Sequence, residues 1–192
     1  MIKSTVAAAL LMALSHTAHA DWALDKDNST LSFVSVKKSD VMEAHHFNHI
    51  NGTLTANGAF SLVIDLSSVD TAIAIRDSRM GKHLFETNKF PQATLSATLP
   101  TKALAKLVVN QTAMMKVPAS LSLHGEKQAI NADVSVTLLS DGNLLVSSNK
   151  PVFVKAGDFN LVKGIEKLRE LAGLPSISTT VPVTFSLRLN NK

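Results

Sequence analysis

Apolar and polar residues alternate along most of the chain after residue 21. The last such segment, residues 180–190, has an apolar side chain at every second position from Val181 to Leu189. Successive side chains of a strand point to opposite faces of a sheet, so this period of two predicts strands with one apolar face. Residues 59–67 repeat the pattern, and further β-rich runs lie at residues 30–37, 53–56, 93–99, 119–124, 129–139, 143–148 and 152–154.

Turn signals separate these runs, and two segments follow a different period. Asn51-Gly52, Asn57-Gly58 and Asp141-Gly142 are dipeptides that favour tight turns between strands. Residues 76–87 and 162–172 carry apolar residues three and four positions apart, which predicts short helices. Seven to nine strands, one or two short helices and no linker predict an all-β protein, a closed or nearly closed antiparallel barrel.

The first twenty residues read as a signal peptide and not as part of the fold. Lys3 precedes an apolar run at residues 6–14, and Ala18-His19-Ala20 has the small residues that signal peptidase requires. The run is too short to span a bilayer, which takes about 20 residues, and no later stretch reaches that length. We therefore expect residues 1–20 to be removed on export to the periplasm and residues 21–192 to form one domain without a transmembrane segment.

Composition narrows the range of functions. The formal net charge is only +4 and the basic residues are scattered, which argues against binding of nucleic acid. The absence of cysteine means that a core must supply the stability of an exported domain. Eight Phe, one Trp and no Tyr offer few hydroxyl groups to a polar ligand, so a guest inside the barrel would be mostly hydrocarbon.

No pattern of catalytic residues is present, and no enzymatic activity is expected. The chain has no Gly-x-Ser-x-Gly motif and no paired-carboxylate pattern. Asp77 and Ser78 are interpreted as partners of free amides at the start of the first helix, and Arg76 as a tie between that helix and the barrel.

Three histidines lie close together in the sequence. Imidazoles at the density of His45, His46 and His49, with Glu43 nearby, can bind zinc or copper. Their spacing matches no established motif, and alternate residues of a strand face opposite sides. A loop at the rim of the barrel is the favoured interpretation, and a metal site made by the three histidines is kept as an alternative.

Several segments together resemble the YceI-like family. Val69-Asp70-Thr71 is followed by residues 75–80, with the sequence Ile-Arg-Asp-Ser-Arg-Met, and by Lys89-Phe90-Pro91. Residues 119–125 and the element Lys155-Ala156-Gly157-Asp158-Phe159 also agree with the family. The resemblance covers nearly all of residues 21–192. It departs at residues 42–49, where the family often has a glycine-rich, aromatic segment.

This resemblance implies an all-β fold, an eight-stranded antiparallel lipocalin-like barrel, with a hydrophobic tunnel that binds a polyisoprenoid. The expected role is a periplasmic carrier of a long-chain isoprenoid lipid, such as an isoprenoid quinone, with no other cofactor. Apolar residues would line the tunnel, and the expected ones are Phe33, Phe60, Leu62, Ile64, Leu66, Leu84, Phe85, Phe90, Leu121, Leu123, Val134, Val136, Phe153, Phe159, Val183, Phe185 and Leu187.

Alternation alone does not distinguish a tunnel from a filled core. A second hypothesis is therefore a solid barrel with a structural or partner-binding role, whose rim contacts a membrane redox protein. A third is a periplasmic metal binder that uses His45, His46 and His49. A homodimer is compatible with each hypothesis, although no residue requires one.

Overall fold

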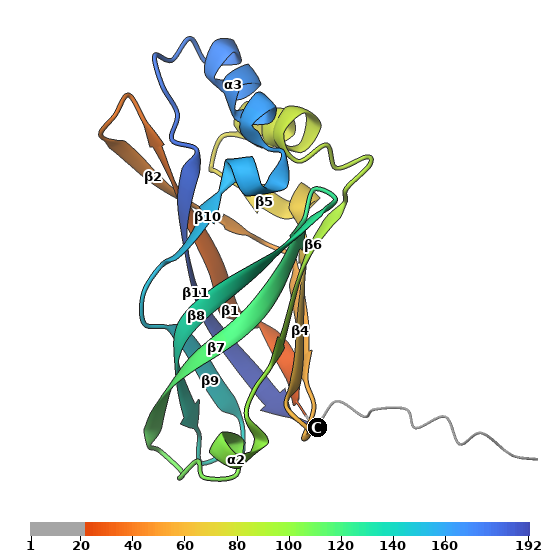
Figure 1. Ribbon diagram of the computed structural model, residues 1–192, viewed down its shortest axis with the longest axis vertical. Coiled ribbons are helices and arrows are strands. Elements are labelled where there is room, and N and C mark those ends of the chain that lie inside the picture. Colours follow the sequence, from red (N-terminus) through yellow and green to blue (C-terminus); the bar gives the residue numbers. More distant parts are fainter. Residues whose placement is uncertain (1–21) are drawn as a thin grey trace, which may run out of the picture.

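The computed structural model describes residues 22–192, so the predicted signal peptide lies outside the described residues. The chain forms a tall barrel with helices at one end (Figure 1). We call this helical end the upper end and the opposite end, where β11 finishes, the lower end.

Antiparallel strands close the barrel of the described chain, and eight of them form its wall. β11 pairs with β1, which joins the two edges of the sheet. The predicted eight-stranded antiparallel barrel is confirmed. In order around the wall, the strands are β1 (Trp22–Lys37), β3 (Ile50–Leu54), β4 (Ala59–Asp65), β6 (Gln92–Thr98), β7 (Thr112–Leu123), β8 (Glu126–Leu138), β9 (Leu144–Ser148) and β11 (Thr180–Asn191).

Three shorter strands extend the upper part of the wall. β2 (Val41–Phe47) forms a hairpin with the second half of β1, and β10 (Val152–Lys155) pairs with the start of β11. β5 (Val69–Asp70) pairs with the end of β2. The β1–β2 hairpin therefore rises beyond the closed barrel beside the helices (Figure 1).

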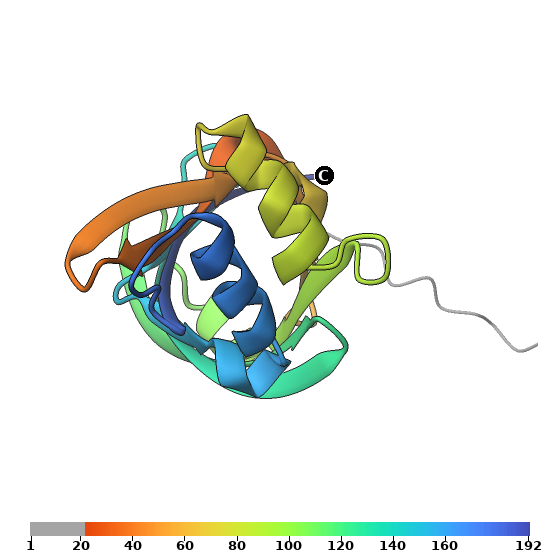
Figure 2. The same ribbon diagram turned by 90° about the horizontal axis from the view of Figure 1, so that it is seen from above.

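Two helical segments lie side by side over the upper end (Figure 2). The first is α1 (Ala74–Arg79), which continues as a π-helical turn, η2 (Met80–Leu84). The second is α3 (Val162–Leu171), which ends before Gly173 as the sequence predicts. Of two short 3-10 turns, η1 (Leu66–Ser68) connects β4 to β5 and η3 (Ala156–Phe159) connects β10 to α3, and α2 (Thr101–Leu104) lies at the lower end.

A glycine lets the two helices approach closely. A Cβ atom at Gly164 of α3 would lie 2.7 Å from the carbonyl oxygen of His83 and 2.8 Å from Cα of Leu84. Both atoms belong to the backbone of η2, so a larger residue would push the two helices apart. Arg79 joins the same pair of helices, because its Nη1 donates a hydrogen bond to the carbonyl oxygen of Leu171 (3.2 Å).

The lower end is closed by packed side chains. Leu54 and Val136 have no exposed surface, and Leu144 and Leu189 are each 1% exposed. Trp22 packs against this core and donates a hydrogen bond from Nε1 to the carbonyl oxygen of Gly142 (3.2 Å). These side chains close the barrel at this end.

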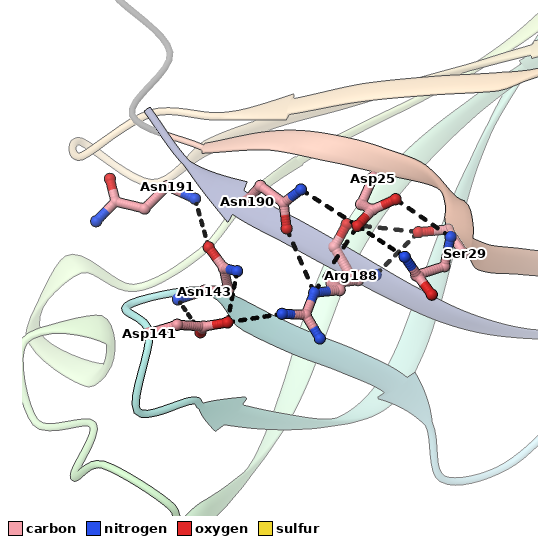
Figure 3. Close-up of polar contacts among 8 residues, drawn as sticks. Asp25, Ser29, Asp141, Asn143, Arg188, Asn190 and Asn191 are labelled. Carbon is pink, nitrogen blue, oxygen red and sulfur yellow. Dashed lines mark hydrogen bonds and ion pairs between the residues drawn. The ribbon is translucent and has the colours of Figure 1, made fainter.

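A polar cluster around Arg188 ties three elements together at the lower end (Figure 3). Arg188 of β11 donates from Nη2 to Asp141 in the β8–β9 turn (2.7 Å) and forms an ion pair with Asp25 of β1 (3.8 Å). Asn190 donates to the same Asp25 carboxylate (3.2 Å). A hydrogen bond from Asn28 is the main cause that lowers the pKa of Asp25, with that from Asn190 adding to it. The cluster connects β11 to the irregular stretch of β1 between Asp25 and Thr30.

Candidate ligand-binding site

The interior of the barrel holds a cavity of about 220 Å³ that reaches from the helices down to Leu54 and Leu189, and its exposed wall atoms are all apolar. Small side chains leave this room. Ala97 of β6 and Ala119 of β7 are paired across neighbouring strands, and both line the cavity together with Ala93 and Ala132. An alanine at an inward position leaves space that a leucine or a phenylalanine would fill.

β11 follows the cavity from the helices toward the lower end. Val183 and Phe185 face inward and line the cavity, yet each is only partly buried. Two and four residues further along the same face, Leu187 and Leu189 also line the cavity, and they are 3% and 1% exposed. The side chains of this strand therefore become more tightly buried toward the lower end.

The helices form the roof of the cavity. Met80, Leu84 and Phe85 come from η2 and its end, and Leu161 and Ile165 come from the start of α3. Phe47 of β2 connects this roof to the wall, since its ring centroid lies 5.4 Å from that of Phe33 and 6.0 Å from that of Phe85. Residues far apart in sequence thus enclose one apolar space.

Thirteen of the seventeen residues that the sequence indicated lie in the cavity wall. They come from strands β1, β4, β7, β8 and β11 and from the segments that follow β4. They are Phe33, Phe60, Leu62, Ile64, Leu66, Leu84, Phe85, Leu121, Leu123, Val134, Val183, Phe185 and Leu187.

Phe153 and Val136 were predicted to line the tunnel and do not. Phe153 lies on the outer face of β10 and is 62% exposed, because its neighbours Val152 and Val154 take the inner face. Val136 faces inward but lies in the packed lower end, with no exposed surface. Alternation fixed the face of Val136 correctly and left its depth in the barrel undetermined.

Phe90 and Phe159 also lie outside the cavity wall. The ring of Phe90 packs against His124 (4.5 Å between centroids) and covers Gly125 at the β7–β8 turn. Phe159 is 2% exposed within η3, and its carbonyl oxygen lies 3.2 Å from Nδ1 of His124. Both phenylalanines therefore fasten the upper turns of the barrel to one another.

Some cavity residues were not foreseen from the sequence. Alanine marks an apolar face less clearly than a bulky residue does, and this applies to Ala93, Ala97, Ala119 and Ala132. Their signal was present, since each occupies an inward position of an alternating strand. The other unforeseen residues include Leu31, Phe47, Met80, Val117, Ile130, Val152 and Val154.

The first helix, α1, begins without a side-chain cap, although its sequence suggested one. Asp77 accepts hydrogen bonds from the backbone N–H of Thr71 (3.0 Å) and from its hydroxyl group, and no side chain caps α1. The role assigned to Asp77 and Ser78 as partners of helix-start amides is therefore wrong. The role assigned to Arg76 is confirmed, because its guanidinium donates to the carboxylate of Glu43 on β2 (2.5 Å).

The three clustered histidines point to different partners. His45 is 3% exposed and its Nε2 lies 2.9 Å from the Ser35 hydroxyl. His46 lies on the opposite face of β2, beside Asn48 and Asp70, and His49 lies 3.7 Å from Asp65. Within residues 22–192, no group of three or more His, Cys, Asp or Glu side chains is arranged to hold a metal ion. The structure does not bring the three imidazoles together.

Charged groups gather above the aromatic end of the cavity. Glu43 accepts hydrogen bonds from Lys37 (2.8 Å) and Arg76, and those from Lys37 and Arg76 lower the pKa of its carboxyl group. Burial lowers the pKa of His45, and the positive charge of Arg76 lowers it further. The imidazole is therefore neutral near pH 7, next to a carboxylate that stays ionised.

Comparison with known sequences gives the family. A sequence model of the YceI-like domain matches residues 22–189, which is almost all of the described chain. The chain belongs to the YceI-like family. No curated protein gives a significant match.

Solved structures of YceI-like and related proteins share the fold. A polyisoprenoid binding domain from Saccharophagus degradans, implicated in plant cell wall breakdown, is 40% identical with a TM-score of 0.87, over 91% of this chain and 100% of that one. BcnA of Burkholderia cenocepacia is 21% identical (TM-score 0.64; 86% and 98% covered), and the YceI protein of Campylobacter jejuni is 15% identical (TM-score 0.53; 77% and 84% covered). These last two similarities concern the fold alone. Among the described residues, no helix combines the length and the apolar character needed to cross a membrane.

Proposed function

We propose that this protein carries a long-chain isoprenoid lipid, an isoprenoid quinone or a related polyisoprenoid, in the periplasm. The observation that carries the proposal is the internal cavity, whose wall exposes only apolar atoms and whose roof consists of separate helices. The 40% identical domain from Saccharophagus degradans is described as polyisoprenoid-binding, and the present chain spans all of that domain. The predicted signal peptide at residues 1–20 and the lack of cysteine support the periplasmic setting.

Burial of hydrocarbon would provide most of the affinity. Each CH₂ group transferred from water into the cavity contributes about 0.8 kcal/mol, opposed by the entropy lost when a flexible tail is ordered. Inward residues of β7 line the cavity from Val117 to Leu123, six steps of about 3.4 Å each along the strand. A tail longer than about 20 Å would therefore fold back or protrude.

The alternative with a solid core has less support. An interior without a cavity would bury all inward side chains, whereas Phe60, Val183 and Phe185 are only partly buried on the inner face. The open middle of the barrel favours a guest over a purely structural role.

Native mass spectrometry tests the proposal directly. The protein would be purified from periplasm without detergent, and any bound lipid would be extracted and identified. A stoichiometric isoprenoid is the expected result. A ligand-free protein that also fails to take up added quinone would refute the proposal.

A further inference from the structure

The apolar cavity ends at a row of polar residues on the same inner face. Phe33 on β1 and Phe47 on β2 both line the cavity. The next residues on this face of the hairpin are Ser35 on β1 and His45 on β2, because Phe33 is the direct partner of His45 in the strand register. The rings of Phe33 and His45 lie 5.2 Å apart between centroids, so the imidazole directly adjoins the aromatic end of the cavity.

His45 has a buried polar atom without a partner. Its Nε2 is paired with the Ser35 hydroxyl, while its Nδ1 has no hydrogen-bond partner among the described residues. An unsatisfied polar atom lowers stability when its side chain is as buried as that of His45, which is 3% exposed. Nε of Arg76 is likewise buried without a partner in this part of the chain, although both Nη atoms are used. Two unsatisfied groups therefore come from neighbouring elements at one end of the cavity.

The charges around His45 are balanced. Lys37 of β1 and Arg76 of α1 are positive, and Glu43 of β2 and Asp77 of α1 are negative. Both Lys37 and Arg76 already pair with Glu43. No net positive charge is left over for a phosphate or diphosphate, which would require an excess of basic groups. An uncharged head group with a carbonyl or hydroxyl oxygen needs no excess of basic groups.

We propose that Nδ1 of His45 binds the oxygen of an uncharged lipid head group, a carbonyl or a hydroxyl, at the upper end of the cavity. Nε of Arg76, which is also buried without a partner among the described residues, is a second donor on the neighbouring helix. A neutral imidazole serves either head group, since Nδ1 donates to a carbonyl in one tautomer and accepts from a hydroxyl in the other. The Ser35 hydroxyl adapts to both tautomers because it donates or accepts equally well. This inference rests on the proposed function and specifies the chemical class of the head group.

The test compares three probes that share one prenyl tail: geranylgeraniol, its parent hydrocarbon and geranylgeranyl diphosphate. The full mature chain is titrated with each probe. We expect the alcohol to bind about tenfold more tightly than the hydrocarbon, the gain typical of one buried hydrogen bond, and the diphosphate to bind no more tightly than the alcohol. His45→Phe keeps an aromatic ring beside Phe33 and should lower the affinity for the alcohol to that for the hydrocarbon.

His46→Phe is the matched control. His46 is on the same strand but faces outward, so this variant should keep the preference for the alcohol. A second measurement uses the unmodified protein, with ¹⁵N-labelled histidine and the His45 signals assigned through contacts with the Phe33 ring. The Nδ1 resonance should shift when the alcohol binds and stay unchanged when the hydrocarbon binds.

The outcomes separate this inference from the proposed function. Equal affinity for alcohol and hydrocarbon, or a tighter complex with the diphosphate, would overturn the head-group assignment and leave lipid binding intact. An unchanged Nδ1 resonance in the alcohol complex would overturn it as well. If none of the three probes binds, the lipid-carrier function itself fails.

Discussion

Filling the cavity should make the protein more stable and less able to bind lipid. Ala119 lines the cavity beside Ala97, its partner on the neighbouring strand, and Ala119→Leu would add three carbon atoms there. At about 0.8 kcal/mol per buried carbon, the gain is about 2.4 kcal/mol. Ordering the leucine side chain costs about 0.5–1 kcal/mol, which leaves a net stabilisation of about 1.5–2 kcal/mol. For a domain of this size, the melting temperature should rise by about 3–8 °C.

The assay measures two quantities on the same variant. Thermal unfolding of lipid-free protein, followed by circular dichroism, gives the stability, and uptake of an isoprenoid quinone gives the binding. Ala129→Leu is the control, because Ala129 is exposed on the outer face of β8 and the change should affect neither quantity. A filled core would respond with the opposite sign, since overpacking usually destabilises by about 1–3 kcal/mol. Loss of stability in Ala119→Leu would therefore refute an open interior, and unchanged uptake would show that lipid does not occupy the middle of the barrel.

Three further predictions concern the tail, the roof and pH. Affinity for a series of prenyl alcohols, measured by titration, should rise with tail length and level off once the tail fills about 20 Å, and a steady loss with length would contradict burial in the cavity. Gly164→Ala should destabilise the protein by about 1–3 kcal/mol in urea unfolding and speed lipid release, because its Cβ would meet the η2 backbone at 2.7 Å. Gly157→Ala, with no atom within 4 Å of the new Cβ, should change neither. Since burial lowers the pKa of His45, the unfolded chain takes up this proton first as the pH falls. The contribution of the neutral His45 to the free energy of unfolding is complete above the pKa of about 6.5 in the unfolded chain and decreases below it. The stability lost between about pH 7.5 and 5.5 should therefore be smaller in His45→Gln than in the unchanged protein. Parallel curves of stability against pH for the two proteins would contradict the burial of a neutral His45.

Alternation along the strands was sufficient to predict the barrel and most of the cavity wall. In β11 the period of two assigned Val183, Phe185 and Leu187 to the inner face, where the structure places them. The same rule gave less at β10, because every residue of the run Val152–Val154 is apolar and the only polar residue that marks the outer face is Lys155 at the end of the strand. Phe153, the bulkiest residue of the run, was predicted to face inward, whereas it faces outward.

Depth and tertiary contacts could not be obtained from the period. Val136 and Val134 lie on the same face of β8, yet only Val134 lines the cavity, and a period of two carries no information on this difference. The pairing of Ala97 with Ala119 depends on strand register, which long-range packing determines. His45 looked like a member of a histidine cluster because the three residues are close in sequence. Its burial follows from the β1–β2 pairing, which turns it inward next to Phe33.

The cavity weakens the barrel that contains it, and this links stability to occupancy. The side chains of its apolar wall have fewer neighbours than those of a filled core, and a void in a core lowers the free energy of unfolding. The Arg188 cluster at the lower end stabilises the fold through contacts in which no ligand takes part. A lipid that fills the upper part restores the missing contacts and binds only the folded state, so it must raise the free energy of unfolding in proportion to the logarithm of its concentration. Small residues such as Ala119 thus lower the stability of the unliganded barrel for the same reason that they leave room for a guest.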